Sequence, residues 1–177
     1  MKRKLMTIFC VVGLLFAVST AQAYTLTIAD GYYVGSINDG IPSSTLDELA
    51  YLLNLIALDP GDTDTIGTET YSRVGSTLNG SLPSPTYYDK DEDDPGSWTV
   101  NFSGLIYVLG KYDAAAAGSL VWLINVDAGD TIVLPEKYND KGLSHISLWT
   151  TGVVPEPGTL LLLGLGLVGL AGLRRKF

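Results

Sequence analysis

The chain has 177 residues, which is enough for one domain of ordinary size. Its charge is unevenly placed, because residues 24–152 contain 5 basic and 18 acidic residues and so carry a net charge of −13. Nucleic-acid phosphates repel such a domain, so nucleic acid is excluded as a partner. The same segment is too apolar and too aromatic for a disordered chain.

The first 23 residues have the three parts of a secretory signal peptide. A basic start at Lys2–Lys4 is followed by an apolar run over Leu5–Val18 and by the small-x-small pattern of Ala21 and Ala23. The run is short for a bilayer about 30 Å thick, which favours cleavage over a retained anchor. We expect signal peptidase to cut after Ala23, so that the mature chain begins at Tyr24.

Cysteine chemistry is absent from the expected mature domain. The single cysteine, Cys10, lies inside the signal peptide. An exported domain without cysteine has no disulfide, no thiol nucleophile and no cysteine-based metal site. Its core must therefore stabilise the fold alone.

Two strands and a helix are predicted next. Alternating apolar and polar residues predict strands over residues 24–28 and 32–37, paired with each other. The helix begins with the form of a capping box, in which Thr45 is the N-cap and Glu48 the third helical residue. Its predicted apolar face, at helical spacing, consists of Leu46, Leu49, Ala50, Leu53, Ile56 and Ala57.

Residues 59–97 are rich in Gly, Thr, Ser, Pro and Asp, which predicts long loops with short strands. Within them, Asp89, Asp91 and Asp93 have the D-x-D-x-D spacing that begins an EF-hand loop. The glycine and the final glutamate that such a loop requires are missing. Two interpretations stay open: a looser Ca²⁺ site, which is the one cofactor that the residues suggest, and a solvated acidic loop.

The second half of the chain is dominated by buried strands. A run over residues 98–109 begins as an alternating pattern and becomes apolar on both faces, which places it at the centre of a sheet. Further strands are predicted over residues 119–126, 131–134 and 143–151, with the second a hairpin partner of the first. The prediction is a mainly β fold, a single antiparallel β-sandwich with one short helix over residues 24–152.

His145 is the only histidine of the chain, so it would have to carry any histidine-dependent catalysis. Adjacent residues of a strand point to opposite faces, so Ser144 cannot face its ring. The sequence also lacks a G-x-S-x-G nucleophile motif. We interpret His145 as structural and predict no catalytic residue.

The last 25 residues form a tail with three parts. A rigid Pro-Glu-Pro segment precedes the uncharged, Leu/Gly-rich stretch Thr159–Leu173, and a basic cluster ends the tail. At 1.5 Å per residue, a helix over Gly158–Leu173 is roughly 24 Å long, slightly less than the hydrocarbon thickness. The basic end should stay cytoplasmic, so residues 24–152 lie outside the cytoplasmic membrane.

This tail resembles the PEP-CTERM sorting signal of bacterial exported proteins. The residues that carry the resemblance are Val154, Pro155, Glu156, Pro157 and Gly158, followed by the short helix and by the basic stop of Arg174, Arg175 and Lys176. The resemblance implies that exosortase, a membrane-embedded protease, cuts near the Pro-Glu-Pro segment. It also implies transient anchoring in the cytoplasmic membrane, followed by delivery to the cell surface or to the extracellular polysaccharide matrix. The same pattern is identified as a C-terminal domain of ice-binding proteins.

The expected function is that of a non-enzymatic surface or matrix protein with a structural or interaction role. One alternative is a polysaccharide-binding module, with or without Ca²⁺. The other is a glycosidase that uses two of the many carboxylates, for which an aromatic-lined cleft with two facing carboxylates would be the evidence. The predicted partners are signal peptidase, exosortase, the membrane before processing and extracellular polysaccharide.

Overall fold

The computed structural model describes residues 21–38, 44–74, 82–91, 96–112 and 118–152. These residues form a three-stranded and an eight-stranded sheet with one helix. None of the helices that they form has the length and apolar character needed to cross a membrane. The elements are β1 (Ala23–Thr25), β2 (Tyr33–Asn38), α2 (Thr45–Ala57), β3 (Thr63–Ile66), β4 (Glu69–Arg73), β5 (Thr86–Asp91), β6 (Ser97–Thr99), β7 (Gly104–Tyr112), β8 (Gly118–Val126), β9 (Thr131–Val133), β10 (Lys137–Tyr138) and β11 (Lys141–Thr150).

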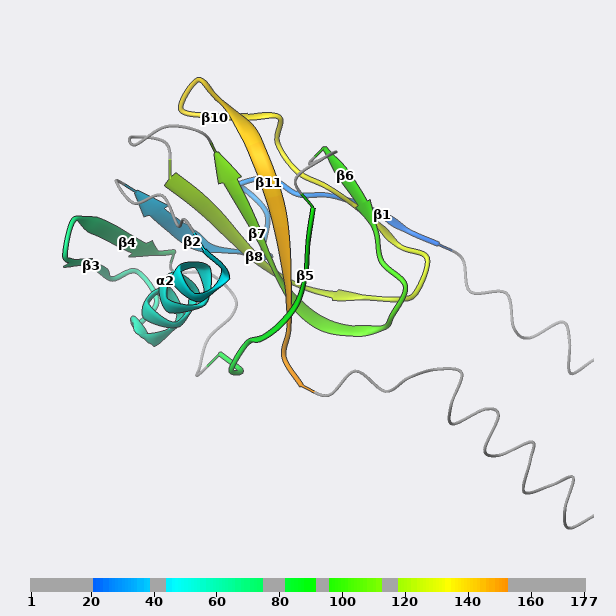
Figure 1. Ribbon diagram of the computed structural model, residues 1–177, viewed down its shortest axis with the longest axis horizontal. Coiled ribbons are helices and arrows are strands. Elements are labelled where there is room, and N and C mark those ends of the chain that lie inside the picture. Colours follow the sequence, from blue (N-terminus) through cyan, green and yellow to red (C-terminus); the bar gives the residue numbers. More distant parts are fainter. Residues whose placement is uncertain (1–20, 39–43, 75–81, 92–95, 113–117, 153–177) are drawn as a thin grey trace, which may run out of the picture.

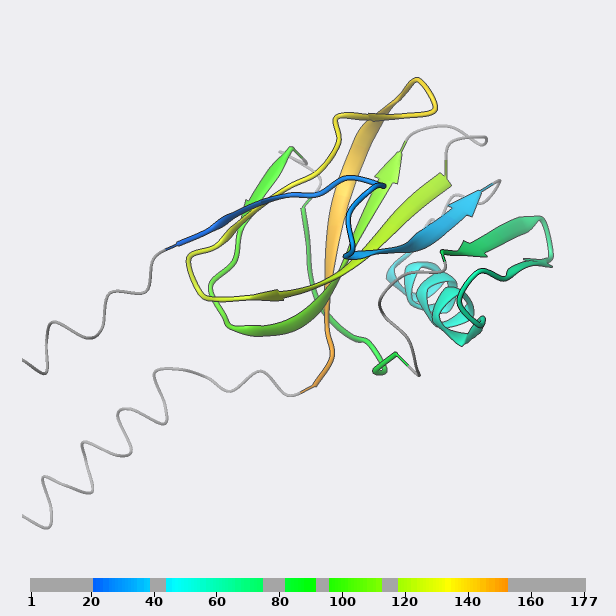
Figure 2. The same ribbon diagram turned by 180° about the vertical axis from the view of Figure 1, so that it is seen from behind.

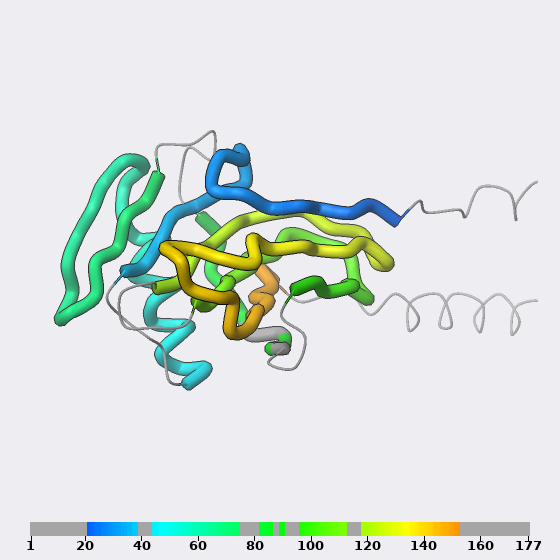
Figure 3. The backbone as a smooth tube through the Cα atoms, turned by 90° about the horizontal axis from the view of Figure 1, so that it is seen from above, coloured from blue at the N-terminus to red at the C-terminus, as the bar shows by residue number. Residues whose placement is uncertain are grey.

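The two sheets and the helix form layers, and the predicted mainly β sandwich with one short helix is confirmed (Figure 1). The large sheet has the order β10-β11-β7-β8-β2-β4-β3, and β5 also pairs with β11. All of its paired strands are antiparallel. The small sheet has the order β1-β9-β6, in which β1 and β9 are parallel and lie side by side in Figure 3.

Strands β7 and β8 are buried on both faces, as the double-sided apolar pattern of residues 98–109 predicts for β7. On one face, side chains such as Val108 and Trp122 pack against the small sheet, which contributes Ile132. On the opposite face, side chains such as Leu109 pack beneath α2, which contributes Leu52. The large sheet is therefore the middle layer, with a separate core on each side of it (Figure 2).

The predicted strand over residues 98–109 is divided between the two sheets. Its first part is β6 of the small sheet and its second part is β7 of the large one, while Val100 and Phe102 between them are buried in the core that separates the sheets. Gly104, at the start of β7, has a φ of 145°, a conformation that glycine adopts much more readily than other residues. The chain thus changes sheets at this point.

Two predicted pairings are wrong. Strand β2 pairs with β4 and β8 instead of β1, and β9 pairs with β1 and β6 instead of returning beside β8. Both errors have the same physical cause. A turn-rich connection permits a hairpin, but burial of the apolar faces of both strands decides which strands pair.

Candidate functional site

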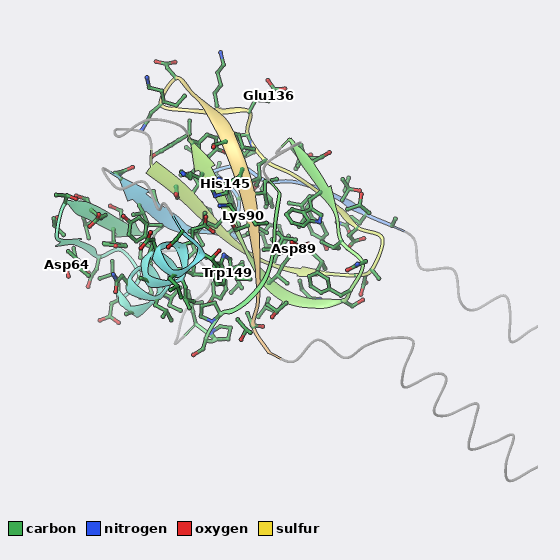
Figure 4. All side chains as sticks on the ribbon, viewed as in Figure 1. Asp64, Asp89, Lys90, Glu136, His145 and Trp149 are labelled. Carbon is green, nitrogen blue, oxygen red and sulfur yellow. The ribbon has the colours of Figure 1, made fainter. Side chains whose placement is uncertain are left out.

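A buried polar cluster lies between the helix and the large sheet. It consists of Glu48 from α2, Lys90 from β5, and His145 and Ser147 from β11, and we call it the Glu48 cluster. Figure 4 shows His145 and Lys90 near each other beside the helix, on the paired strands β11 and β5. Burying polar groups costs free energy unless they are paired, and clusters of buried titratable groups often mark functional sites. The Glu48 cluster is therefore a candidate functional site.

The start of α2 decides where Glu48 points. The N-cap is Ser44 instead of the predicted Thr45: the Ser44 hydroxyl accepts from the backbone N–H of Asp47 at 3.3 Å and donates to the Asp47 carboxylate at 2.9 Å. Asp47 therefore takes the role that the sequence suggested for Glu48. Glu48 lies on the same helical face as Leu52 and Leu55, because residues four and seven apart share a face, and all three are buried against the sheet.

Strand alternation supplies the partners of Glu48. Along β11, His145 and Ser147 point to the helix side, whereas Ile146 and Leu148 point into the core between the sheets. Lys90 lies opposite Ser147 in the β5–β11 register, so its side chain emerges on the same face. Three strand residues thus converge on one helical carboxylate.

Both oxygens of the Glu48 carboxylate are occupied. His145 Nε2 lies 2.8 Å from Glu48 Oε1, the Ser147 hydroxyl donates to Oε2 at 2.6 Å, and Lys90 Nζ lies 3.4 Å from Oε1. Glu48 and Ser147 are fully buried, His145 is 3% exposed, and the Lys90 side chain is 19% exposed. Of the four residues, Lys90 thus has the most access to solvent.

The electrostatics favour an ionised carboxylate. Burial acts to raise the pKa of Glu48, but the hydrogen bonds of His145 and Ser147 and the charges of His145 and Lys90 outweigh it, so the pKa lies below its usual value. The cluster is therefore a charged carboxylate surrounded by donors, the arrangement that a buried acid requires.

The geometry of the cluster differs from that of a catalytic triad. In a triad the serine hydroxyl donates to the histidine, which removes its proton. Here Ser147 donates to Glu48, and the carboxylate lies between the hydroxyl and the ring of His145. The arrangement joins α2 to β11 and β5, and it agrees with the structural interpretation of His145. Sequence analysis missed Glu48, although an acid in line with Leu52 and Leu55 was a usable signal.

The apolar face of α2 is only partly the one predicted. Leu49 and Ile56 pack against the core beside the buried Leu52 and Leu55, whereas Leu46 is 76% and Leu53 is 42% exposed. A pocket of about 520 Å³ lies at the end of the helix, where Arg73 donates to the carbonyls of Ile56 and of the C-cap residue Leu58. Its lining residues are Leu53, Ile56, Ala57, Leu58, Asp59, Pro60, Arg73 and Leu82.

The outer face of the small sheet is uncharged. Tyr24, Ile132 and Trp98 lie in one row and pack on the core, so the residues on either side of them in each strand point outward. We call these six the hydroxyl face: Ala23, Thr25, Ser97, Thr99, Thr131 and Val133. The hydroxyl oxygens of Thr99 and Thr131 lie 3.2 Å apart across the strands.

The predicted calcium site is only partly described. Asp89 is exposed, and its carboxylate accepts from the backbone N–H of Lys90 at 2.8 Å. The backbone of Asp91 belongs to β5, but its side chain and the whole of Asp93 lie outside the described residues. Among the described residues, no three His, Cys, Asp or Glu side chains gather in a way that could hold a metal ion. The calcium site stays a prediction.

The other predicted site residues lie at the two ends. Ala21 is exposed and Ala23 begins β1, so both residues of the predicted signal cleavage site are described. The whole tail lies outside the described residues, including the sorting motif Val154, Pro155, Glu156, Pro157 and Gly158 and the basic stop Arg174, Arg175 and Lys176.

Comparison with known proteins identifies the tail. The family model of the PEP-CTERM protein-sorting motif matches residues 153–176. No curated protein matches the chain, and no solved structure does. The match confirms the predicted sorting class: the chain carries the signal of an exported protein that exosortase processes and that is sorted to the cell surface.

Proposed function

We propose that the domain over residues 24–152 is a non-catalytic module that the cell displays on its surface, where it has a structural or interaction role. The observation that carries this proposal is the closed Glu48 cluster. His145, the only histidine of the chain, is 3% exposed, and its hydrogen bond with Glu48 joins the helix to the sheet. Its burial and its hydrogen bond to a carboxylate support a structural role for this ring.

The route to the surface is part of the same proposal. The signal peptide starts export, and the Leu/Gly-rich stretch anchors the chain in the cytoplasmic membrane for a time, with its basic end inside. Exosortase then cuts near Pro155–Pro157 and separates the domain from this anchor. The domain, released or still attached to the cell, then lies in the extracellular polysaccharide matrix.

The experiment compares catalysis with stability. The exported domain and its His145→Gln variant are incubated with extracellular polysaccharide from the producing cells, and newly formed reducing ends are counted. We expect no reducing ends from either protein and a lower melting temperature for the variant. Release of reducing ends by the native protein would refute the proposal.

A second candidate is binding of a neutral polysaccharide, and the hydroxyl face favours it. Four of its six side chains are Thr or Ser, and none is charged, in a domain that carries −13. Hydroxyl groups on the outer face of a sheet can exchange hydrogen bonds with sugar hydroxyls, directly or through water. The surrounding negative charge repels anionic polymers, so an uncharged polymer fits best.

The test places charge on this face and on a matched surface. In the double variant Thr25→Glu/Ser97→Glu, both changes lie on exposed positions of the hydroxyl face. The control, Thr63→Glu/Thr65→Glu, makes the same charge change on β3, where every residue is exposed. We expect at least a tenfold loss of co-sedimentation with neutral polysaccharide in the first variant alone. Equal binding by both variants, or none by the native protein, would contradict this candidate.

A further inference from the structure

The folded domain includes two residues that the expected signal cleavage would remove. Ala23 is the first residue of β1 and pairs with Thr131 of β9. Gln22, before it, uses both of its backbone groups: its carbonyl accepts from the N–H of Thr131 at 2.8 Å, and its nitrogen donates to the Asp130 carboxylate at 2.6 Å. The parallel ladder between β1 and β9 therefore begins at Gln22.

The acceptor of this last bond is a buried acid. Asp130 is 3% exposed, and its second carboxylate oxygen accepts from the backbone N–H of Asp127 at 2.8 Å. Among the residues that the structure describes, no Lys, Arg or His side chain forms an ion pair with it. An ammonium donor adds Coulomb attraction to the hydrogen bond that a neutral amide makes with a carboxylate. Asp130 has two amide donors, and a cation in place of one of them would interact with it more strongly.

We propose that signal peptidase cuts between Ala21 and Gln22, and that the α-ammonium group of Gln22 forms an ion pair with Asp130 in the mature protein. The nitrogen already lies at ion-pair distance from the carboxylate, so cleavage turns an amide donor into a cation without moving the strand. The required small-x-small pattern is present here too, as Ser19 and Ala21.

The alternative cut, after Ala23, has a structural cost. It removes the nitrogen that donates to Asp130, the carbonyl that accepts from Thr131, and the first residue of β1, which has three residues. One oxygen of a buried carboxylate then loses its donor, which destabilises a fold more than the loss of an exposed hydrogen bond. The ion pair does not depend on what the mature domain binds.

The first test is the N-terminal residue of the full chain after export by the producing cells. Intact mass and N-terminal sequencing separate the two cuts, which differ by the masses of Gln22 and Ala23. We expect an unmodified Gln22 with a free amine. A mature chain beginning at Tyr24 would overturn the proposal. Conversion of Gln22 to pyroglutamate would also overturn it, because the cyclised nitrogen carries no positive charge.

Two matched substitutions test the cleavage site itself, before folding begins. Ala23→Glu places a large acid at the last position before the alternative cut, whereas Ser19→Glu spoils the small-x-small pattern of the proposed one. We expect Ala23→Glu to be processed as the native chain is, and Ser19→Glu to accumulate as precursor on an immunoblot. The reverse result would refute the proposal. Ala23 is exposed, so its substitution leaves the domain able to fold.

Discussion

Replacing Glu48 by Gln should destabilise the domain strongly, because the change keeps the shape of the side chain and removes its charge. Two hydrogen bonds, from His145 and Ser147, then end on a neutral amide. A hydrogen bond to a charged group contributes about 1.5–3 kcal/mol and a neutral one about 0.5–1.5 kcal/mol. The expected loss for the two bonds is therefore about 2–3 kcal/mol. For a domain of this size that corresponds to a fall in melting temperature of roughly 8–12 °C.

The control is the same substitution at a carboxylate that also joins the helix to a strand. Glu69 of β4 accepts from the Tyr51 hydroxyl of α2 at 2.9 Å, but Glu69 is partly exposed. Solvent screens such a contact, so Glu69→Gln should lower the melting temperature much less. Thermal unfolding followed by circular dichroism measures both variants. Equal shifts for the two would refute the reasoning, because burial would then make no difference.

The pH dependence of Glu48→Gln provides a second check. The folded-state pKa of Glu48 lies below its usual value, so the stability that it contributes is complete above the pKa of the unfolded chain, about 4.3, and is lost as the pH falls through the folded-state pKa. The gap in melting temperature between native protein and variant should thus be widest near neutral pH and narrow in acid. A gap that stays constant down to about pH 3 would show that the charge of Glu48 is not its cause.

Three further predictions concern the ends of the chain and the acidic segment. The mature protein should lack the residues after about Pro157, and alanines in place of Pro155–Pro157 should block the cut; intact masses from envelope and medium check both. A thiol reductant should leave the melting temperature unchanged, because Cys10 is the only cysteine and lies in the signal peptide. If Asp91 and Asp93 bind Ca²⁺, millimolar calcium should raise the melting temperature more than sodium chloride of equal ionic strength, and Asp91→Ala/Asp93→Ala should abolish the difference.

Local patterns were sufficient to predict most elements and the sorting class. The double-sided apolar run of β7 identifies a central strand, because a strand buried on both faces needs apolar residues at nearly every position. The tail was recognisable without any tertiary contact, since a short sequence in an extended chain is what a processing enzyme reads. Strand alternation likewise predicted that Ser144 does not share the face of His145.

The sequence pattern did not predict which distant strands pair with each other. The pattern at residues 131–134 is compatible with a hairpin beside β8 and with a place between β1 and β6. The choice depends on which arrangement covers the apolar face of β8, and that is a property of the whole core. The division of residues 98–109 between two sheets has the same origin.

The sequence by itself determined where the protein goes and which class of fold it adopts, because signals and periodicities are local. Only the tertiary structure decided what its single histidine does. Glu48 shares the buried face of α2 with Leu52 and Leu55, and His145, 97 residues further along the chain, meets its carboxylate there. The buried charge of Glu48 is stabilised by partners from both β11 and β5. Such contacts between distant parts of the chain form only when the chain folds.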